Sequence, residues 1–241
     1  MSPTEPIESG TDLDADVLAP PWHTGALMVV MVAVAVTGTL LSSRGVSTAR
    51  SPVDISSRFV AVYLPMLLVQ WSLLVYVCRV GRSRNALPLL LGKRWTSARR
   101  AFSDIALALL GWGLIEGAEL LFARLFGIDR NSGVLRLLPT GDYERLAWIL
   151  VSVSVGFCEE VVYRGYLQTQ LKAFTRSPVL GVTLQALLFG MAHGEQGLAA
   201  ATRLALYGFA LGGLAAWRGS LLPGIICHIG IDLASGFVGG R

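Results

Sequence analysis

The chain has 241 residues, of which 53% are hydrophobic and only 15% are Asp, Glu, Lys or Arg. Soluble domains carry about 25% charged residues, so this composition excludes an ordinary soluble protein and predicts an integral membrane protein. The net charge is a modest +4, and seven Lys or Arg residues lie in one segment, 79–100. Apolar stretches flank that segment on both sides, which indicates a cytoplasmic loop rather than a nucleic-acid-binding patch.

The first 22 residues contain five acidic side chains and no Lys or Arg, which excludes a signal peptide with a basic start. We expect residues 1–22 to form a disordered acidic tail and residues 23–241 to form one membrane domain. The three cysteines are an odd number and form no CxxC, which argues against a disulfide framework or a zinc ribbon.

Seven apolar stretches follow the tail, each about as long as a membrane-spanning helix. Their limits are 24–42, 58–78, 101–126, 145–171, 178–193, 199–217 and 221–238. Only helices and closed barrels satisfy backbone hydrogen bonds in lipid, and these stretches are too long and too continuously apolar for barrel strands. The predicted fold is therefore an all-α, polytopic transmembrane bundle. An eighth helix would arise if 84–95 re-enters the membrane or if 128–139 inserts.

Two features of these stretches concern packing and orientation. Pro65 is a candidate kink in the second stretch, and the fourth is long enough to protrude from the membrane. Two GxxxG spacings, at 190–194 and 208–212, predict close helix contacts. A cytoplasmic loop at 79–100 places the N-terminus on the cytoplasmic side.

Three pairs of residues at i and i+4 interrupt the last apolar stretches. The pairs are Glu160 with Arg164, Phe189 with His193, and His228 with Asp232. Spacing by four places both members on one helix face, and polar groups within a membrane bundle face its interior or a cavity. We therefore expect the fourth, fifth and seventh helices to line one shared pocket.

Glu159 precedes the first of these pairs. It lies about 100° around the helix from Glu160, so Arg164 can neutralise Glu160 and leave Glu159 without a partner on its own helix. Such a carboxylate is a candidate general base. Peptide hydrolysis needs a nucleophile, here water, a base that deprotonates it, and donors where negative charge develops.

The strings CEEVVYRG, FGMAH and HIGID resemble the EExxxR, FxxxH and HxxxN/D motifs of the CAAX protease and bacteriocin-processing family. These membrane endopeptidases, also called the ABI family, are related to the Rce1-type CAAX prenyl protease. All three motifs are present in order, and the resemblance covers residues 145–235. It implies a multi-pass protein of a prokaryotic plasma membrane that cleaves a protein or peptide substrate. Prenylated CAAX tails, peptide precursors and membrane regulators all stay open as substrates.

The resemblance also implies residue roles. Glu159 and His193 would activate a water, and His228 and Asp232 would hold the carbonyl oxygen. The site would be organised by Glu160, Arg164 and Phe189. Asp232 stands where many family members have Asn, and an ionised Asp cannot donate a hydrogen bond to an oxyanion, so it would instead be protonated or orient His228 as an acceptor.

Other interpretations remain open on the sequence. We expect no cofactor, but Glu159, His193 and His228 are the candidate ligands if zinc is bound. Cys158 is a weaker candidate nucleophile, since buried free cysteine commonly packs as a small apolar group. A non-proteolytic proton-coupled transporter, or an immunity or scaffold factor, is the alternative from another class. Glu116 and Glu119 are a candidate separate ion site, although a helix end near Arg124 is the simpler interpretation.

Overall fold

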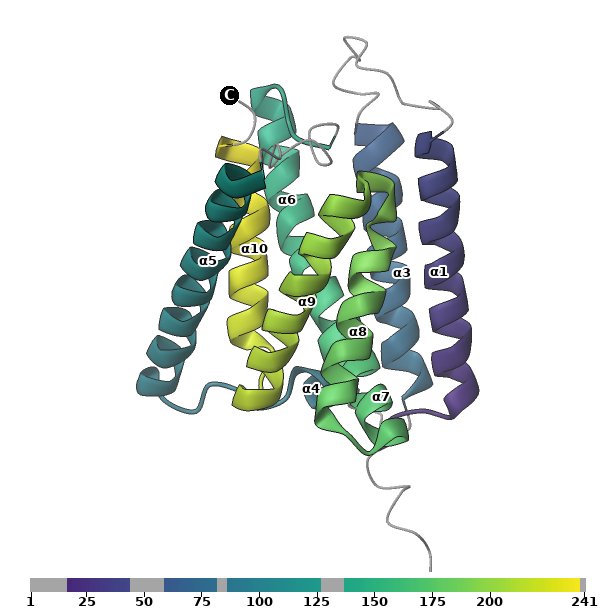
Figure 1. The fold of residues 1–241 in the computed structure, drawn as a ribbon. Coiled ribbons are helices and arrows are strands. Elements are labelled where there is room, and N and C mark those ends of the chain that lie inside the picture. The colour runs from purple at the N-terminus through teal and green to yellow at the C-terminus, as the bar shows by residue number, and fades with distance from the viewer. Residues whose placement is uncertain (1–16, 44–58, 82–85, 127–136, 239–241) are drawn as a thin grey trace, which may run out of the picture.

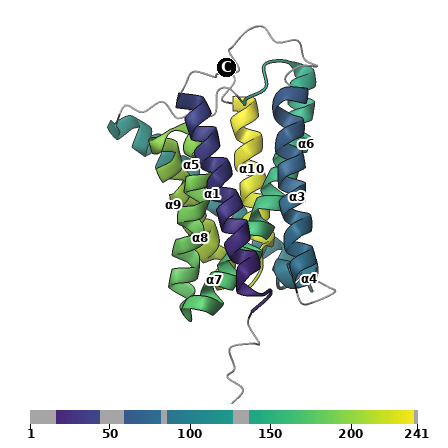
Figure 2. The same cartoon turned by 90° about the vertical axis from the view of Figure 1, so that its right-hand side faces the viewer.

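The computed structural model describes residues 17–43, 59–81, 86–126 and 137–238. Within these ranges the regular structure is helical, and the helices run roughly along one common axis (Figures 1 and 2). A single backbone bridge between Gly92 and Ser220 is the one strand-like pairing there. The predicted all-α bundle is therefore confirmed.

Each of the seven predicted stretches corresponds to a helical rod, and 84–95 contributes a short eighth helix. The elements are α1 (Pro21–Ser43), the π-helix η2 (Phe59–Tyr63), α3 (Leu64–Val80), α4 (Ala86–Leu91), α5 (Ala98–Phe126), α6 (Asp142–Glu159), the π-helix η3 (Glu160–Leu167), α7 (Gln168–Thr175), α8 (Pro178–Ala192), the 3₁₀ turn η4 (Gly194–Gln196), α9 (Leu198–Arg218) and α10 (Leu222–Val238). Most of the acidic tail and most of 128–139 lie outside the described residues.

Three of these helices are long and apolar enough to cross a membrane: Pro21–Leu40, Asp142–Thr175 and Leu198–Arg218. The second has 34 residues, or roughly 50 Å at 1.5 Å per residue, which exceeds the ~30 Å hydrocarbon layer as predicted. Leu64–Val80, Pro178–Ala192 and Leu222–Phe237 are shorter apolar helices. Pro65 is the second residue of α3, at the point where the π-helix η2 passes into an α-helix.

The centre of the bundle is η3, whereas α6, which leads into it, exposes Leu146, Leu150 and Val153. In Figure 1, α5 and α10 lie on one side of α6, and α1 and α3 lie on the other. Every residue of η3 is buried, including Glu160 and Arg164. By contrast, α5 exposes Leu109, Leu114 and other large apolar side chains, as expected of a surface that faces lipid. The charged side chains of Glu160 and Arg164 therefore lie inside the bundle.

Glycines and the side chain of Gln185 hold α8 against α9. A Cβ on Gly208 would lie 3.0 Å from Ala186 Cα, and one on Gly190 would lie 2.7 Å from Ala205 Cβ. The side-chain amide of Gln185 donates to the Gly208 carbonyl at 2.8 Å. The predicted close packing at 190 and at 208–212 is therefore present. Gly194 differs, because it lies in η4 and approaches Thr39 of α1 instead.

The α8–α9 contact should depend on the absence of a side chain at Gly208. We expect Gly208→Leu to lower the free energy of unfolding by about 1–3 kcal/mol through overpacking. Gly213→Leu on the same helix is the matched control, because nothing lies within 4 Å of a Cβ there. Thermal unfolding of both variants in detergent checks this, and equal melting temperatures would contradict the packing role.

Candidate active site

The helix that carries Glu159 and Glu160 changes its backbone hydrogen-bond pattern between these two residues. It is an α-helix up to Glu159 and a π-helix from Glu160 to Leu167, where the sequence predicted one continuous α-helix. The wider π turn is rare and occurs frequently at functional sites. The change of pattern falls between the two adjacent glutamates, which face different neighbours.

Glu160 is the buried structural carboxylate of the pair. Its Oε1 lies 3.0 Å from the Arg164 guanidinium, and neither side chain is exposed to solvent. The Arg164 Cζ lies 4.3 Å from the centre of the Phe189 ring, which adds a cation–π contact from α8. The predicted intrahelical ion pair is therefore present, and Phe189 covers it.

His228 of α10 shares the same carboxylate oxygen. Its Nδ1 lies 2.9 Å from Glu160 Oε1, and because an ionised carboxylate only accepts, Nδ1 is the donor. The close approach of α10 depends on Gly224, since a Cβ there would lie 3.0 Å from Glu160 Oε2. Glu160 thereby fixes the orientation of the His228 ring.

The other nitrogen of His228 faces two further carboxylates. Its Nε2 lies 3.7 Å from Glu159 Oε2 and 3.8 Å from Asp232 Oδ2. The Asp232 carbonyl accepts a hydrogen bond from Trp148 Nε1 at 2.8 Å, which ties α10 to α6 at this level. His228 thus lies between Glu159 and Asp232.

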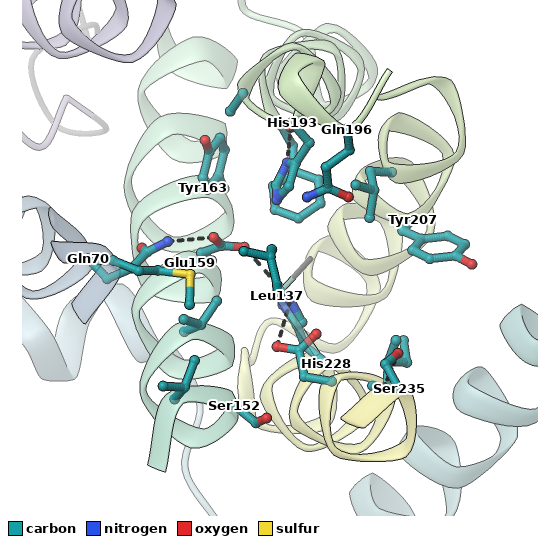
Figure 3. A pocket seen from close by; sticks show the side chains of 18 of the residues that line it. Gln70, Leu137, Ser152, Glu159, Tyr163, His193, Gln196, Tyr207, His228 and Ser235 are labelled. Atoms are coloured by element: carbon teal, nitrogen blue, oxygen red, sulfur yellow. Dashed lines mark hydrogen bonds and ion pairs between the residues drawn. The ribbon is translucent and has the colours of Figure 1, made fainter. Parts of the chain in front are cut away.

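Glu159 has a partner that the motifs did not predict. Gln70 of α3 donates its side-chain amide to Glu159 Oε1 at 2.6 Å, while Oε2 is the oxygen nearest His228 (Figure 3). The side chain of Glu159 is only 7% exposed, so this contact is made within the bundle. An isolated glutamine in an otherwise apolar stretch was the sequence signal for it.

His193 ends α8 and lies on the same cavity. Its Nδ1 donates to the Phe189 carbonyl at 2.7 Å, which leaves Nε2 of the neutral ring as an acceptor. Its ring centre lies 4.8 Å from that of Phe189. The histidine within ion-pair distance of Glu159 is His228, however, whereas the resemblance paired Glu159 with His193.

A cavity of about 300 Å³ connects these side chains (Figure 3). Glu159, His193, His228 and Asp232 all lie on its wall, so α6, α8 and α10 line one shared pocket as the motif spacing predicted. The remaining wall is mainly apolar where α1 and α3 contribute it. Those apolar residues are Val30, Met31, Val34, Met66, Val69 and Leu73.

The wall formed by α5 and α9 is charged. Glu119 of α5 lies 3.2 Å from the Arg203 guanidinium of α9, and both residues line the cavity together with Glu116. The pairing of Glu119 with Arg203 was not among the sequence interpretations, and an ion site at Glu116 and Glu119 stays a prediction. Two residues 84 positions apart in sequence form the contact, so no local spacing could have indicated it.

The candidate metal ligands Glu159, His193 and His228 all lie among the described residues. Among the residues that the structure describes, no group of three or more His, Cys, Asp or Glu side chains is arranged to hold a metal ion. Zinc binding by the three candidates stays a prediction. Cys158 is fully buried in the apolar core and does not line the cavity.

Comparison with known proteins agrees with the motifs. Residues 142–234 match the family model described as "Type II CAAX prenyl endopeptidase Rce1-like". Neither the curated proteins nor the solved structures yield a match. The matched stretch runs from the start of α6 into α10 and contains all three motifs. This motif-bearing part of an integral membrane protein is therefore similar to the Rce1-like family, as CEEVVYRG, FGMAH and HIGID predicted.

Proposed function

We propose that this protein is an intramembrane endopeptidase in which Glu159 activates a water for attack on a peptide bond. One observation carries the proposal: Glu159 lies on the wall of an internal cavity with Oε1 held by an amide and Oε2 near His228 Nε2. Glu160 is already engaged with Arg164 and His228, so its role is structural. Glu159 is therefore the carboxylate available to a water.

The proposed reaction needs only groups of this chain and one water. Glu159 accepts a proton from the water while the water oxygen bonds to the peptide carbonyl carbon. This attack leaves a negative charge on the carbonyl oxygen. The C–N bond then breaks, and Glu159 passes the proton to the departing amine. The distance of 3.7 Å between His228 Nε2 and Glu159 Oε2 is longer than a hydrogen bond, as is common in catalytic sites without substrate.

The histidines take different parts in this scheme. His228, held at Nδ1 by Glu160, presents Nε2 to the cavity and donates to the carbonyl oxygen when that nitrogen is protonated. Asp232, whose Oδ2 lies 3.8 Å from the same nitrogen, attracts the ring electrostatically and so orients it, because an ionised Asp has no hydrogen to donate. His193, with Nε2 as acceptor, receives a hydrogen bond from the water. Such interactions strengthen in a cavity of low dielectric constant.

The cavity supports an apolar or membrane-associated peptide as the substrate. Val30, Met31 and Val34 of α1 and Met66 and Val69 of α3 offer an apolar wall opposite the polar groups. A CAAX-like tail, with or without a prenyl group, or a peptide precursor would suit a cavity with one apolar wall and one polar wall. The family's description favours the first, since it names prenyl endopeptidases.

We further propose a multi-pass topology in a prokaryotic plasma membrane. The described part of the basic segment, from 86 to 100, lies at the same end of the bundle as α7 (Figure 1). An excess of Lys and Arg marks the cytoplasmic side of membrane proteins. We assign that end to the cytoplasm and residues 23–241 to a single membrane domain.

The assignment of Glu159 as the base predicts the effect of one substitution. Glu159→Gln should lower kcat/KM by about 10²–10⁴-fold while thermal stability is retained. Purified protein in nanodiscs is incubated with peptides ending in Cys, two aliphatic residues and Ser, with and without a farnesyl group, and products are measured by mass spectrometry. Asp142→Asn, an exposed acid-to-amide change on the same helix, is the control.

Equal cleavage by wild type and Glu159→Gln would show that Glu159 is not the base. Absence of cleavage of either peptide by the wild type, together with proton uptake into liposomes that contain it, would replace the endopeptidase by a proton-coupled transporter.

The two glutamates should separate in a stability measurement. Glu160→Gln leaves the buried Arg164 charge without its counter-charge, so we expect a loss of about 3–5 kcal/mol in the free energy of unfolding. Glu160→Gln combined with Arg164→Met removes both charges and should recover part of that loss. Denaturant or thermal unfolding in detergent measures it. A melting temperature of Glu160→Gln equal to that of the wild type would contradict the structural role.

The proposed chemistry uses no metal, so chelation should leave activity intact. We expect cleavage rates within about twofold of the untreated enzyme after dialysis against a strong zinc chelator. Loss of activity that added Zn²⁺ restores, with one zinc per chain by elemental analysis, would instead support a metal held by Glu159, His193 and His228.

A further inference from the structure

A single amide interrupts the apolar sequence of α3. Gln70 lies between Val69 and Trp71 in the middle of LPMLLVQWSLLVYVCRV, outside the stretch that matches the family model. A polar side chain within a membrane helix is disfavoured unless it has a partner or a function. Gln70 is half-buried on the cavity wall, and its partner there is Glu159.

The contact between Gln70 and Glu159 has a defined direction. An ionised carboxylate only accepts hydrogen bonds, so the amide nitrogen of Gln70 is the group that faces it, at 2.6 Å from Oε1. Hydrogen bonds to a charged acceptor are short and about twice as strong as neutral ones. The contact holds one oxygen of the carboxylate and leaves the other, Oε2, near His228.

The backbone that presents Gln70 is firmly packed. Leu74 and Val77 follow at i+4 and i+7, on the same face of α3, and both are buried in the main apolar core. That core also contains Val162 and Tyr166 of η3. The face that carries Gln70 is therefore anchored next to the helix that carries Glu159, so the amide has a fixed place relative to the carboxylate.

We propose that Gln70 is a positioning residue for the reaction, which holds the Glu159 carboxylate by Oε1 so that Oε2 meets the water. This inference rests on the proposed role of Glu159 as general base. A base must lie within hydrogen-bond distance of the proton that it takes, roughly 2.6–3.2 Å between heavy atoms. A carboxylate free to rotate about its last side-chain bond spends only part of its time in that geometry.

The alternative role for Gln70 is structural only, as a partner that satisfies a buried carboxylate. The two roles differ in what a substitution changes. Loss of a structural contact lowers stability and affects binding and turnover only through the folded fraction. Loss of a positioning contact lowers kcat in the folded enzyme and leaves KM nearly unchanged.

Gln70→Met tests the proposal, because Met has a similar length, suits a membrane helix and cannot donate a hydrogen bond. We expect kcat on the cleaved peptide to fall about 10- to 100-fold, with KM within about threefold of wild type. Ser72→Met, a polar-to-Met change at an exposed position of the same helix, should retain wild-type kcat. In a Glu159→Gln background, Gln70→Met should cause no further loss. Unchanged kcat in folded Gln70→Met would overturn the proposal.

A second measurement needs no substrate. Dicyclohexylcarbodiimide modifies protonated carboxyl groups in apolar surroundings, and peptide mapping by mass spectrometry reports each site. We expect Gln70→Met to raise labelling of Glu159 several-fold and Ser72→Met to leave it unchanged, because the ionised form of Glu159 loses its donor. Unchanged labelling would overturn the contact itself. Raised labelling together with wild-type activity of Glu159→Gln would retain the contact and overturn its catalytic role, which separates this inference from the proposed function.

Discussion

The carboxylate of Glu160 is the group on which the site depends. It is fully buried, and one of its oxygens lies 3.0 Å from the Arg164 guanidinium and 2.9 Å from His228 Nδ1. Removing such a charge from water is costly, and the attraction of its partners offsets that cost only where the geometry is good. The same oxygen therefore joins η3 to α10 and sets the direction in which His228 presents its second nitrogen. That anchor helps to hold His228 between Glu159 and Asp232.

This constraint explains why the helices approach so closely around the centre. The close approach of α10 to Glu160 requires a glycine at Gly224. The ring of Phe189 lies 4.3 Å from the Arg164 guanidinium carbon, and this contact brings α8 near. Within lipid, apolar surface does not drive helices together, so close backbone contact and interhelical hydrogen bonds have to do so. The glycine seam between α8 and α9, with the Gln185 amide bonded to the Gly208 carbonyl, supplies both. The buried contacts of Glu160 and the glycines at the helix contacts thus both contribute to the close packing of the helices.

The sequence predicts the parts of this arrangement that are local in the chain. Apolar length predicted seven of the rods, and spacing by four predicted the pair of Glu160 with Arg164 and the shared pocket. The same spacing places residues on a helix face but does not measure distances between helices, so it could not show that His228 lies nearer Glu159 than the motif roles implied. Nor could it indicate that the helix becomes π-helical at Glu160. Contacts such as Glu119 with Arg203 join distant positions and have no local pattern.

The cavity wall contains residues from both halves of the chain, whereas the motifs lie only in the C-terminal half. The family match covers the groups that would perform the chemistry, from α6 into α10. The wall opposite them comes from α1 and α3, outside that match, and it contains both the apolar surface for a substrate and the amide that holds Glu159. Under the proposed function, a change of residue in α3 would alter the fit of a substrate or the orientation of Glu159 while all three motifs stay intact. The proposed activity would then depend on helices that carry no motif as well as on the three that do.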